Sequence, residues 1–157
     1  MAEDLALQDR YYTKGRCFGC GPTNQKGLRI KSHVLGDEVV LEWSAEPHHE
    51  AWAGVVNGGI IGALFDCHCN WAAAWHLMNA RGETEPPASV TAEFHVKLRR
   101  PTPSDRPLRI TARVAESDES RAVIEATLTS DDETTATCRG VFVAVPEGHP
   151  AYHRWDA

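Results

Sequence analysis

The longest apolar stretch of the chain lies near its middle, between Gly58 and Asn79. Aliphatic, aromatic and sulfur-containing residues occupy most of its positions, which predicts a helix covered on nearly all sides. Gly82 suits the end of this helix, and Pro86-Pro87 cannot continue it. Polar residues interrupt the stretch too often for a membrane span, so we expect the rest of the chain to wrap around the helix.

Residues on both sides of the helix alternate with a period of two, which is typical of strands with one buried face. Before the helix, the alternation predicts two strands over 28–34 and 39–43, joined by a turn at Gly36-Asp37. After the helix it predicts four more strands, over 90–98, 108–114, 122–128 and 136–145. The short polar links between them favour antiparallel neighbours. We therefore predict an α+β fold, a curved antiparallel sheet of about six strands wrapped around one long central helix.

The first strand after the helix shows the alternation most clearly. Its apolar positions, which we expect to be buried, are Val90, Ala92, Phe94, Val96 and Leu98. A sheet of this size still leaves an open edge and one open side of the helix, and both are commonly covered by dimerisation. A homodimer or a dimer of dimers is expected.

The length of 157 residues indicates a single domain with its own core. We expect a loosely packed N-terminal arm over 1–16, with a short helical turn within 5–11. The domain itself is expected over 17–146, followed by a surface tail over 147–157.

The charge of the chain narrows the possible partners. A net charge of −6 argues against a nucleic-acid surface, which needs a basic stripe. The acidic start of the chain shows no signal peptide or lipid anchor, and the helix is no membrane span, so we expect a cytoplasmic protein without membrane contact.

Five cysteines do not suggest the disulfide framework of a small secreted protein, so we expect reduced thiols. Cys17 and Cys20 form a CxxC pair within a segment rich in turn formers. A zinc site would need two further ligands, which only Cys67, His68 and Cys69 could supply if the fold brought them close. We favour a compact turn, and expect neither a metal nor a cofactor.

Asp66 is the only acidic residue of the predicted helix, which contains no lysine or arginine. An unpaired carboxylate in a covered helix costs several kcal/mol on the order of its desolvation penalty, so Asp66 requires a structural or chemical reason. With 3.6 residues per turn, Gly59, Asp66 and Asn70 lie on one stripe of the helix.

The start of the helix offers a second chemical group. Asn57 is a good N-cap, and Gly58-Gly59 leaves the first amides unshielded, so that an oxyanion could approach them. Amide donors and a carboxylate on one helix suit acyl transfer. The alternative is that the glycines allow close packing and that Asp66 is a satisfied buried acid.

The segment from Gly54 through Asn57 to Gly58-Gly59, followed by Asp66 seven residues later, resembles the signature of the hotdog-fold acyl-CoA thioesterases, in particular the phenylacetate-pathway type. Asn57 stands where those proteins usually have a histidine, and Cys67 stands where a second acid often follows. The CxxCG segment, followed by Asn24-x-x-Gly27-Leu28, is also found in a subset of hotdog proteins. The resemblance covers roughly residues 17–145.

The resemblance implies a hotdog fold and an active site between two subunits, with glycine amides from one chain and the carboxylate from the other. Gly58 and Gly59, capped by Asn57, would then form the oxyanion hole. Asp66 would be the general base or the nucleophile, and Asn70 would position water or the carboxylate.

The resemblance also suggests where the substrate binds. A loop before the helix borders the acyl pocket in the family, which makes His49, Glu50 and Trp52 candidate lining residues. Basic residues cluster beyond the helix, and of these Arg99 and Arg100 are candidates for the CoA phosphates; the alternative is a solvated turn.

The expected activity is hydrolysis of an acyl-CoA or carrier-bound acyl thioester. Two alternatives remain: a non-catalytic acyl-CoA-binding or regulatory module, and an enoyl-thioester hydratase or dehydratase. The latter needs a histidine paired with an acid, and His68 lies about 200° around the helix from Asp66. A nucleophilic Cys67 or Cys69 is a minor alternative. The sequence does not identify the acyl group.

Overall fold

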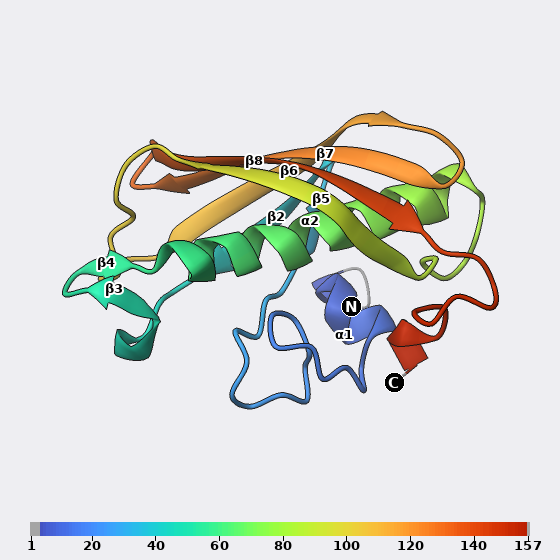
Figure 1. Ribbon diagram of the computed structural model, residues 1–157, viewed down its shortest axis with the longest axis horizontal. Coiled ribbons are helices and arrows are strands. Elements are labelled where there is room, and N and C mark those ends of the chain that lie inside the picture. Colours follow the sequence, from blue (N-terminus) through green and yellow to red (C-terminus); the bar gives the residue numbers. More distant parts are fainter. Residues whose placement is uncertain (1–3, 157) are drawn as a thin grey trace.

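The structure is a computed structural model that describes residues 4–156. Its main sheet has six antiparallel strands in the order β1-β2-β6-β7-β8-β5, and the long helix α2 (Gly58–Ala80) lies across one face of it (Figure 1). The strands are β1 (His33–Leu35), β2 (Glu38–Trp43), β5 (Ser89–Leu98), β6 (Leu108–Ser117), β7 (Arg121–Ser130) and β8 (Glu133–Ala144). The predicted curved sheet around one helix is confirmed.

The ends of α2 follow from its sequence. The Asn57 side chain accepts a hydrogen bond from the Ile60 amide at 3.1 Å and caps the first turn. At the other end, Gly82 has φ +66°, a conformation that glycine adopts without a steric penalty, and the chain leaves the helix there. Between these ends α2 contributes twelve buried residues, which explains its apolar composition.

The first predicted strand is shorter in the structure. Only β1 pairs with β2, while residues 28–32 have no strand structure. Their alternation is still correct, since Leu28, Ile30 and Ser32 are buried. The amides of Leu28 and Ile30 donate to the carbonyls of Phe18 and Gly19, so the cysteine-containing turn takes the place of a neighbouring strand.

The loop before α2 has structure of its own. A 3₁₀ helix, η2 (Pro47–His49), leads into a small hairpin of β3 (Glu50–Trp52) and β4 (Val55–Val56). The hairpin lies beside the N-terminal end of α2 (Figure 1).

Both terminal segments pack more closely than predicted. The short helix α1 (Leu7–Tyr11) confirms the expected helical turn, but Leu7 and Tyr12 are buried, so the described part of the arm is not loose. The C-terminal 3₁₀ helix, η3 (Arg154–Asp156), places Trp155 against Trp71 with ring centroids 4.4 Å apart. Both segments lie on the side of α2 opposite the sheet (Figure 1). Residues 1–3 of the arm and 157 of the tail lie outside the described residues.

The apolar face of β5 corrects the prediction of a buried strand face. Phe94 is 38% exposed and Leu98 is 55% exposed, because β5 is an edge strand and covers only the outer flank of α2. The pairing of β5 with β8 also shifts between Thr91 and Glu93, so that Ala92 is an extra residue in the strand. Before this bulge Ser89 and Thr91 face the helix, in place of Val90 and Ala92, whereas Phe94 and Leu98 after it face the helix as predicted.

Within residues 4–156, the structure contains no helix with the length and apolar character needed to cross a membrane.

Candidate active site

Asp66 contacts the edge strand rather than a cation. The Thr91 hydroxyl on β5 donates a hydrogen bond to Asp66 Oδ1 at 2.6 Å. No described residue donates a hydrogen bond to Oδ2, and the side chain is only partly buried. Asp66 is therefore a carboxylate held at one oxygen and open at the other, an arrangement that suits proton abstraction or nucleophilic attack.

The helix stripe that carries Asp66 runs along β5. One turn later, the Asn70 amide donates to the Ser89 carbonyl at 3.2 Å, and the Ser89 hydroxyl donates to Asn70 Oδ1 at 2.8 Å. The predicted proximity of Asn70 to Asp66 along the helix is present. Its side chain, however, is bonded to Ser89, so Asn70 holds α2 against the edge strand.

Glycines continue the same stripe toward the start of the helix. A Cβ on Gly62 would lie 4.0 Å from Phe94, and one on Gly58 would lie 3.0 Å from Leu98. Bare backbone therefore faces the exposed apolar side chains of the edge strand.

The sequence analysis missed Thr91 and Ser89. Simple alternation placed Val90 and Ala92 toward the helix, and the bulge at Ala92 places Ser89 and Thr91 there instead. A single-residue bulge leaves no periodic signal. The available signal was chemical. Asp66 and Asn70, one turn apart on the helix, need hydrogen-bond partners, and hydroxyl residues on a neighbouring strand can supply them.

The amides at the start of α2 are available to a ligand. The Asn57 side chain accepts from Ile60, and the Asn57 carbonyl accepts from Ile61. No described residue accepts a hydrogen bond from the amides of Gly58 or Gly59. Free amides and the positive end of the helix dipole favour a negatively charged oxygen at this point.

These amides and Asp66 are too far apart to act together within one chain. Seven residues of helix separate Gly59 from Asp66, a rise of about 10.5 Å. An oxyanion donor and a base must each approach one carbonyl group to about 3 Å. The amides and the carboxylate of one chain therefore cannot both reach the same thioester carbonyl.

The candidate loop residues have structural partners. His49 is 7% exposed, packs on Trp43 with ring centroids 5.0 Å apart, and accepts from the Glu46 amide, which caps η2. Burial lowers the pKa of His49. Glu50 accepts from the Ser104 hydroxyl and the Gly54 amide, which lowers the pKa of its carboxyl group.

Trp52, the third candidate lining residue of this loop, is 63% exposed on the β3–β4 hairpin. The hairpin is tied to the rest of the domain by hydrogen bonds from Val56 to Thr102 and from Ser104 to Gly54. Trp52 is thus a large apolar side chain on an anchored support near the N-terminus of α2.

The two candidate arginines differ in their ion pairing. Arg100 forms an ion pair with Glu133, whereas no ion pair forms between Arg99 and a described residue. Arg99 shares a surface hollow of about 690 Å³ with Lys97 and Arg113, on the strands. Arg99 is therefore the freer cation of the two.

His68 does not pair with Asp66. Its Nδ1 accepts from the Ser32 hydroxyl at 2.8 Å and its Nε2 donates to the Val39 carbonyl at 2.9 Å. These contacts place the imidazole on the side of α2 away from Thr91. Complete burial lowers the pKa of His68 to about 4, so the ring is neutral at pH 7.

The Cys69 thiol is likewise unsuited to act as a nucleophile. Cys69 is fully buried, and its contact with Cys138 together with its burial raises the pKa of the Cys69 thiol. A raised pKa leaves the protonated thiol, which is a poor nucleophile.

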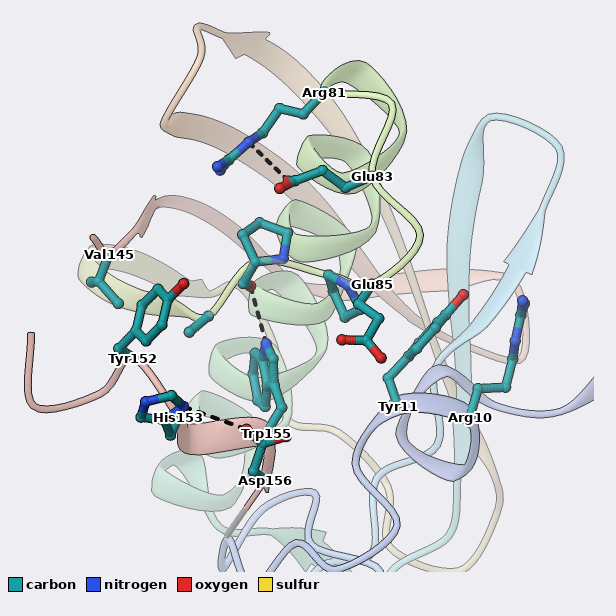
Figure 2. Close-up of a pocket in the computed structure, with 13 residues that line it drawn as sticks. Arg10, Tyr11, Arg81, Glu83, Glu85, Val145, Tyr152, His153, Trp155 and Asp156 are labelled. Atoms are coloured by element: carbon teal, nitrogen blue, oxygen red, sulfur yellow. Dashed lines mark hydrogen bonds and ion pairs between the residues drawn. The ribbon is translucent and has the colours of Figure 1, made fainter. Parts of the chain in front are cut away.

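A separate hollow of about 430 Å³ lies beyond the C-terminal half of α2 (Figure 2). The close-up shows Tyr11 and Arg10 from α1 on one side, and Tyr152 and Trp155 from the C-terminal segment on the other. Asp66 is not among the residues that line it. This hollow is therefore distinct from the candidate active site.

The chain is similar in sequence to one protein family. The sequence profile of the thioesterase superfamily matches residues 53–137, which include the start of α2, Asp66 and Thr91. No curated protein matches the chain.

Solved structures with the same fold come from several bacteria. A thioesterase superfamily protein from Shewanella loihica is 27% identical, with a TM-score of 0.64 over 74% of this chain and 91% of its own. The Escherichia coli PaaI protein from the phenylacetic acid degradation operon is 17% identical, with a TM-score of 0.64 over 76% and 81% of the two chains. A mutant thioesterase from Pseudomonas aeruginosa is 17% identical, with a TM-score of 0.65 over 76% and 83%.

Proposed function

Because the chain belongs to the thioesterase superfamily, we propose that it hydrolyses an acyl-CoA or a related carrier-bound acyl thioester to the free acid and the thiol. The observation that carries this proposal is the carboxylate of Asp66, held by Thr91 at one oxygen and open at the other. The open oxygen leaves this carboxylate free to act on a bound substrate.

The proposed reaction uses the start of α2 from one copy of the chain and the middle of α2 from the other. The Gly58 and Gly59 amides of one subunit stabilise the negative charge that develops on the thioester oxygen. Asp66 of the other subunit either removes a proton from the attacking water or attacks the carbonyl carbon itself. The carbon–sulfur bond then breaks and the thiolate leaves; where Asp66 itself attacks, water hydrolyses the resulting mixed anhydride to release the acid and restore the carboxylate.

The exposed face of β5 supports this assembly. Phe94 and Leu98 form an apolar surface beside the bare helix backbone at Gly58 and Gly62. An edge strand with exposed apolar residues is a site for pairing with a second copy. We propose a homodimer formed through this edge, with Trp52 and the β3–β4 hairpin bordering the acyl pocket.

Purified protein assayed with a panel of acyl-CoAs, with free thiol detected, tests the proposal. We expect turnover of at least one acyl chain class, and a loss on the order of a hundredfold or more in Asp66→Asn with the fold retained. Asp37→Asn, the same change at an exposed aspartate in the turn between β1 and β2, is the matched control and should leave the activity unchanged. Binding of acyl-CoA without turnover would instead support a non-catalytic module.

A further inference from the structure

Three cysteines that are distant in sequence meet on the face of α2 opposite the sheet. The sulfur atoms of Cys17, Cys20 and Cys67 all lie within 4.8 Å of one another. Cys17 and Cys67 are separated by fifty positions, yet their Sγ atoms are 3.7 Å apart. No other histidine, cysteine or carboxylate of the described residues joins this group.

The spacing of the sulfur atoms fits a tetrahedral metal ion. A zinc ion with Zn–S bonds of about 2.3 Å places its thiolate ligands about 3.8 Å apart. The 3.7 Å between Cys17 and Cys67 matches this edge of the tetrahedron. A disulfide would require about 2.05 Å between the two sulfur atoms.

The backbone is shaped to bring the sulfurs together. Gly19 lies between the two cysteines of the turn, and a Cβ at this position would overlap the sulfur of Cys67. Gly21 follows Cys20, and a Cβ there would overlap the backbone of Arg16 and Cys17. The CxxCG pattern thus leaves room for three thiols where two larger side chains would exclude the third.

An orphaned donor also points to this cluster. The indole N–H of Trp71 has no hydrogen-bond partner among the described residues, and the side chain is 1% exposed. It lies beside Cys20. A donor beside a neutral thiol gains little, whereas one beside a metal-bound thiolate is satisfied.

We propose that Cys17, Cys20 and Cys67 bind one Zn²⁺ ion as three thiolates, with a water molecule as the fourth ligand. Each neutral thiol that binds releases its proton to solvent, and no electron is transferred. Thiolate ligands select zinc over the harder divalent cations magnesium and calcium.

The ion would fix a segment that has little regular structure. Residues 13–32 contain no helix or strand, although Leu28 and Ile30 within them are buried. Cys67 follows Asp66 directly but faces this segment instead of β5. Zinc at the three thiols therefore pins the segment to the centre of α2 and does not touch the reacting carboxylate, so the inference stands independently of the proposed hydrolysis.

Metal analysis of the full-length protein purified under reducing conditions tests this site. After removal of metal with a chelator, the protein is titrated with Zn²⁺ against a chromophoric competitor, and with Co²⁺ to observe thiolate-to-cobalt charge transfer. We expect one ion per chain for the wild type and for Cys138→Ala, a buried thiol outside the cluster. We expect loss of this binding in Cys17→Ser and Cys67→Ser.

A second measurement on the wild type avoids reliance on variants that fail to fold. With zinc bound, Cys17, Cys20 and Cys67 should be protected from alkylation, as mapped by mass spectrometry, and chelation should expose them. Wild-type protein that binds no zinc, zinc binding that survives Cys67→Ser, or alkylation that is unchanged by chelation would each overturn the proposal. So would a Cys17–Cys20 disulfide that persists in the reducing buffer.

Discussion

The Thr91 hydroxyl donates a hydrogen bond to Asp66 Oδ1 at 2.6 Å, and this bond fixes the orientation of the carboxylate on the flank of the central helix. The bond exists because the bulge at Ala92 turns Thr91 toward α2. The hydrogen bond to Oδ1 therefore also fixes the position of Oδ2, which has no hydrogen bond to a described residue. Thr91 is thus a positioning residue in the proposed reaction.

Replacing Thr91 by Val tests this role, because valine keeps the shape and removes the hydroxyl. A hydrogen bond to a charged group contributes about 1.5–3 kcal/mol, so we expect kcat to fall by about tenfold or more while KM stays near the wild-type value. Thr91→Ser should restore most of the activity. Steady-state kinetics on the best acyl-CoA of the panel measures both, and an unchanged kcat in the valine variant would contradict the role.

The proposed division of the site between two subunits can be tested by complementation. Asp66→Asn retains the amides, whereas Gly59→Val obstructs the approach to the amides and keeps the carboxylate. If the chains assort at random into dimers, half of the molecules are mixed and one of their two sites is complete, which predicts about one quarter of wild-type activity after mixing. Each variant alone should be nearly inactive.

The mixing experiment requires chains that exchange, so the two variants are unfolded and refolded together. Wild-type protein taken through the same procedure is the control for recovery. Mixed samples that show no more activity than the separate variants would place both groups of the active site within one chain.

Dimerisation through β5 predicts a strong effect of charge at Phe94. This side chain is 38% exposed, and it lies beside Gly62 on the helix and Gly140 on β8. Phe94→Glu would place a charge in the interface, so we expect a monomer in sedimentation experiments together with a loss of activity on the order of a hundredfold. Leu35→Glu, at the opposite edge of the sheet, is the matched control.

Leu35 is 58% exposed, so Leu35→Glu should leave both the dimer mass in sedimentation and the activity unchanged. A monomeric Phe94→Glu protein with full activity would separate the active site from the dimer. Dissociation caused by Leu35→Glu alone would instead assign the interface to the opposite edge.

The sequence predicted the fold because its strongest signals are periodic. An apolar stretch capped by Asn57 and ended at Gly82 defines α2, and alternation defines the four strands that follow it. It also predicted the stripe on which Asp66 and Asn70 lie, since helix geometry alone fixes that relationship.

The parts of the fold and of the candidate site that the sequence did not predict depend on features without periodicity. The extra residue at Ala92 places Ser89 and Thr91 on the helix side in place of Val90 and Ala92, and residues 28–32 bond to a turn rather than to a strand. The meeting of Cys67 with Cys17 depends on which side of α2 the N-terminal segment crosses, which local sequence does not encode. Tertiary contacts therefore decide the partners of Asp66 and of the thiols.

The two candidate arginines predict different kinetic effects on a nucleotide-containing substrate. Arg99 has no ion-pair partner among the described residues, whereas Arg100 is paired with Glu133. If Arg99 contacts a CoA phosphate, a charge-assisted hydrogen bond is lost in Arg99→Ala, and KM for acyl-CoA should rise by about tenfold. A short thioester without the nucleotide should be hydrolysed as by the wild type.

Arg100→Ala serves as the matched control at the neighbouring position, with an expected change in KM of less than about fivefold, since a surface ion pair contributes at most about 1 kcal/mol. Equal effects of Arg99→Ala on both substrates, or none on either, would identify Arg99 as a surface residue outside the binding site.

The buried histidine predicts how the stability of the fold depends on pH. His68 is bonded to Ser32 and Val39 as a neutral ring, and burial lowers its pKa from 6.5 to about 4. Above pH 6.5 the ring is neutral in both states and has no effect on the pH dependence. As the pH falls from about 6.5 to about 4, the unfolded chain binds a proton that the native state excludes, which removes roughly 3 kcal/mol from the free energy of unfolding.

Urea unfolding at a series of pH values across this window measures the effect. Other groups also titrate there, so the informative quantity is the difference between the wild type and His68→Gln. The variant should be less stable near pH 7, because its amide does not reproduce both ring hydrogen bonds, and it should lose less stability on acidification. His76→Gln, a change at a partly exposed histidine of the same helix, should follow the wild-type profile. Parallel profiles for the wild type and His68→Gln would show that His68 does not control the acid sensitivity of the fold.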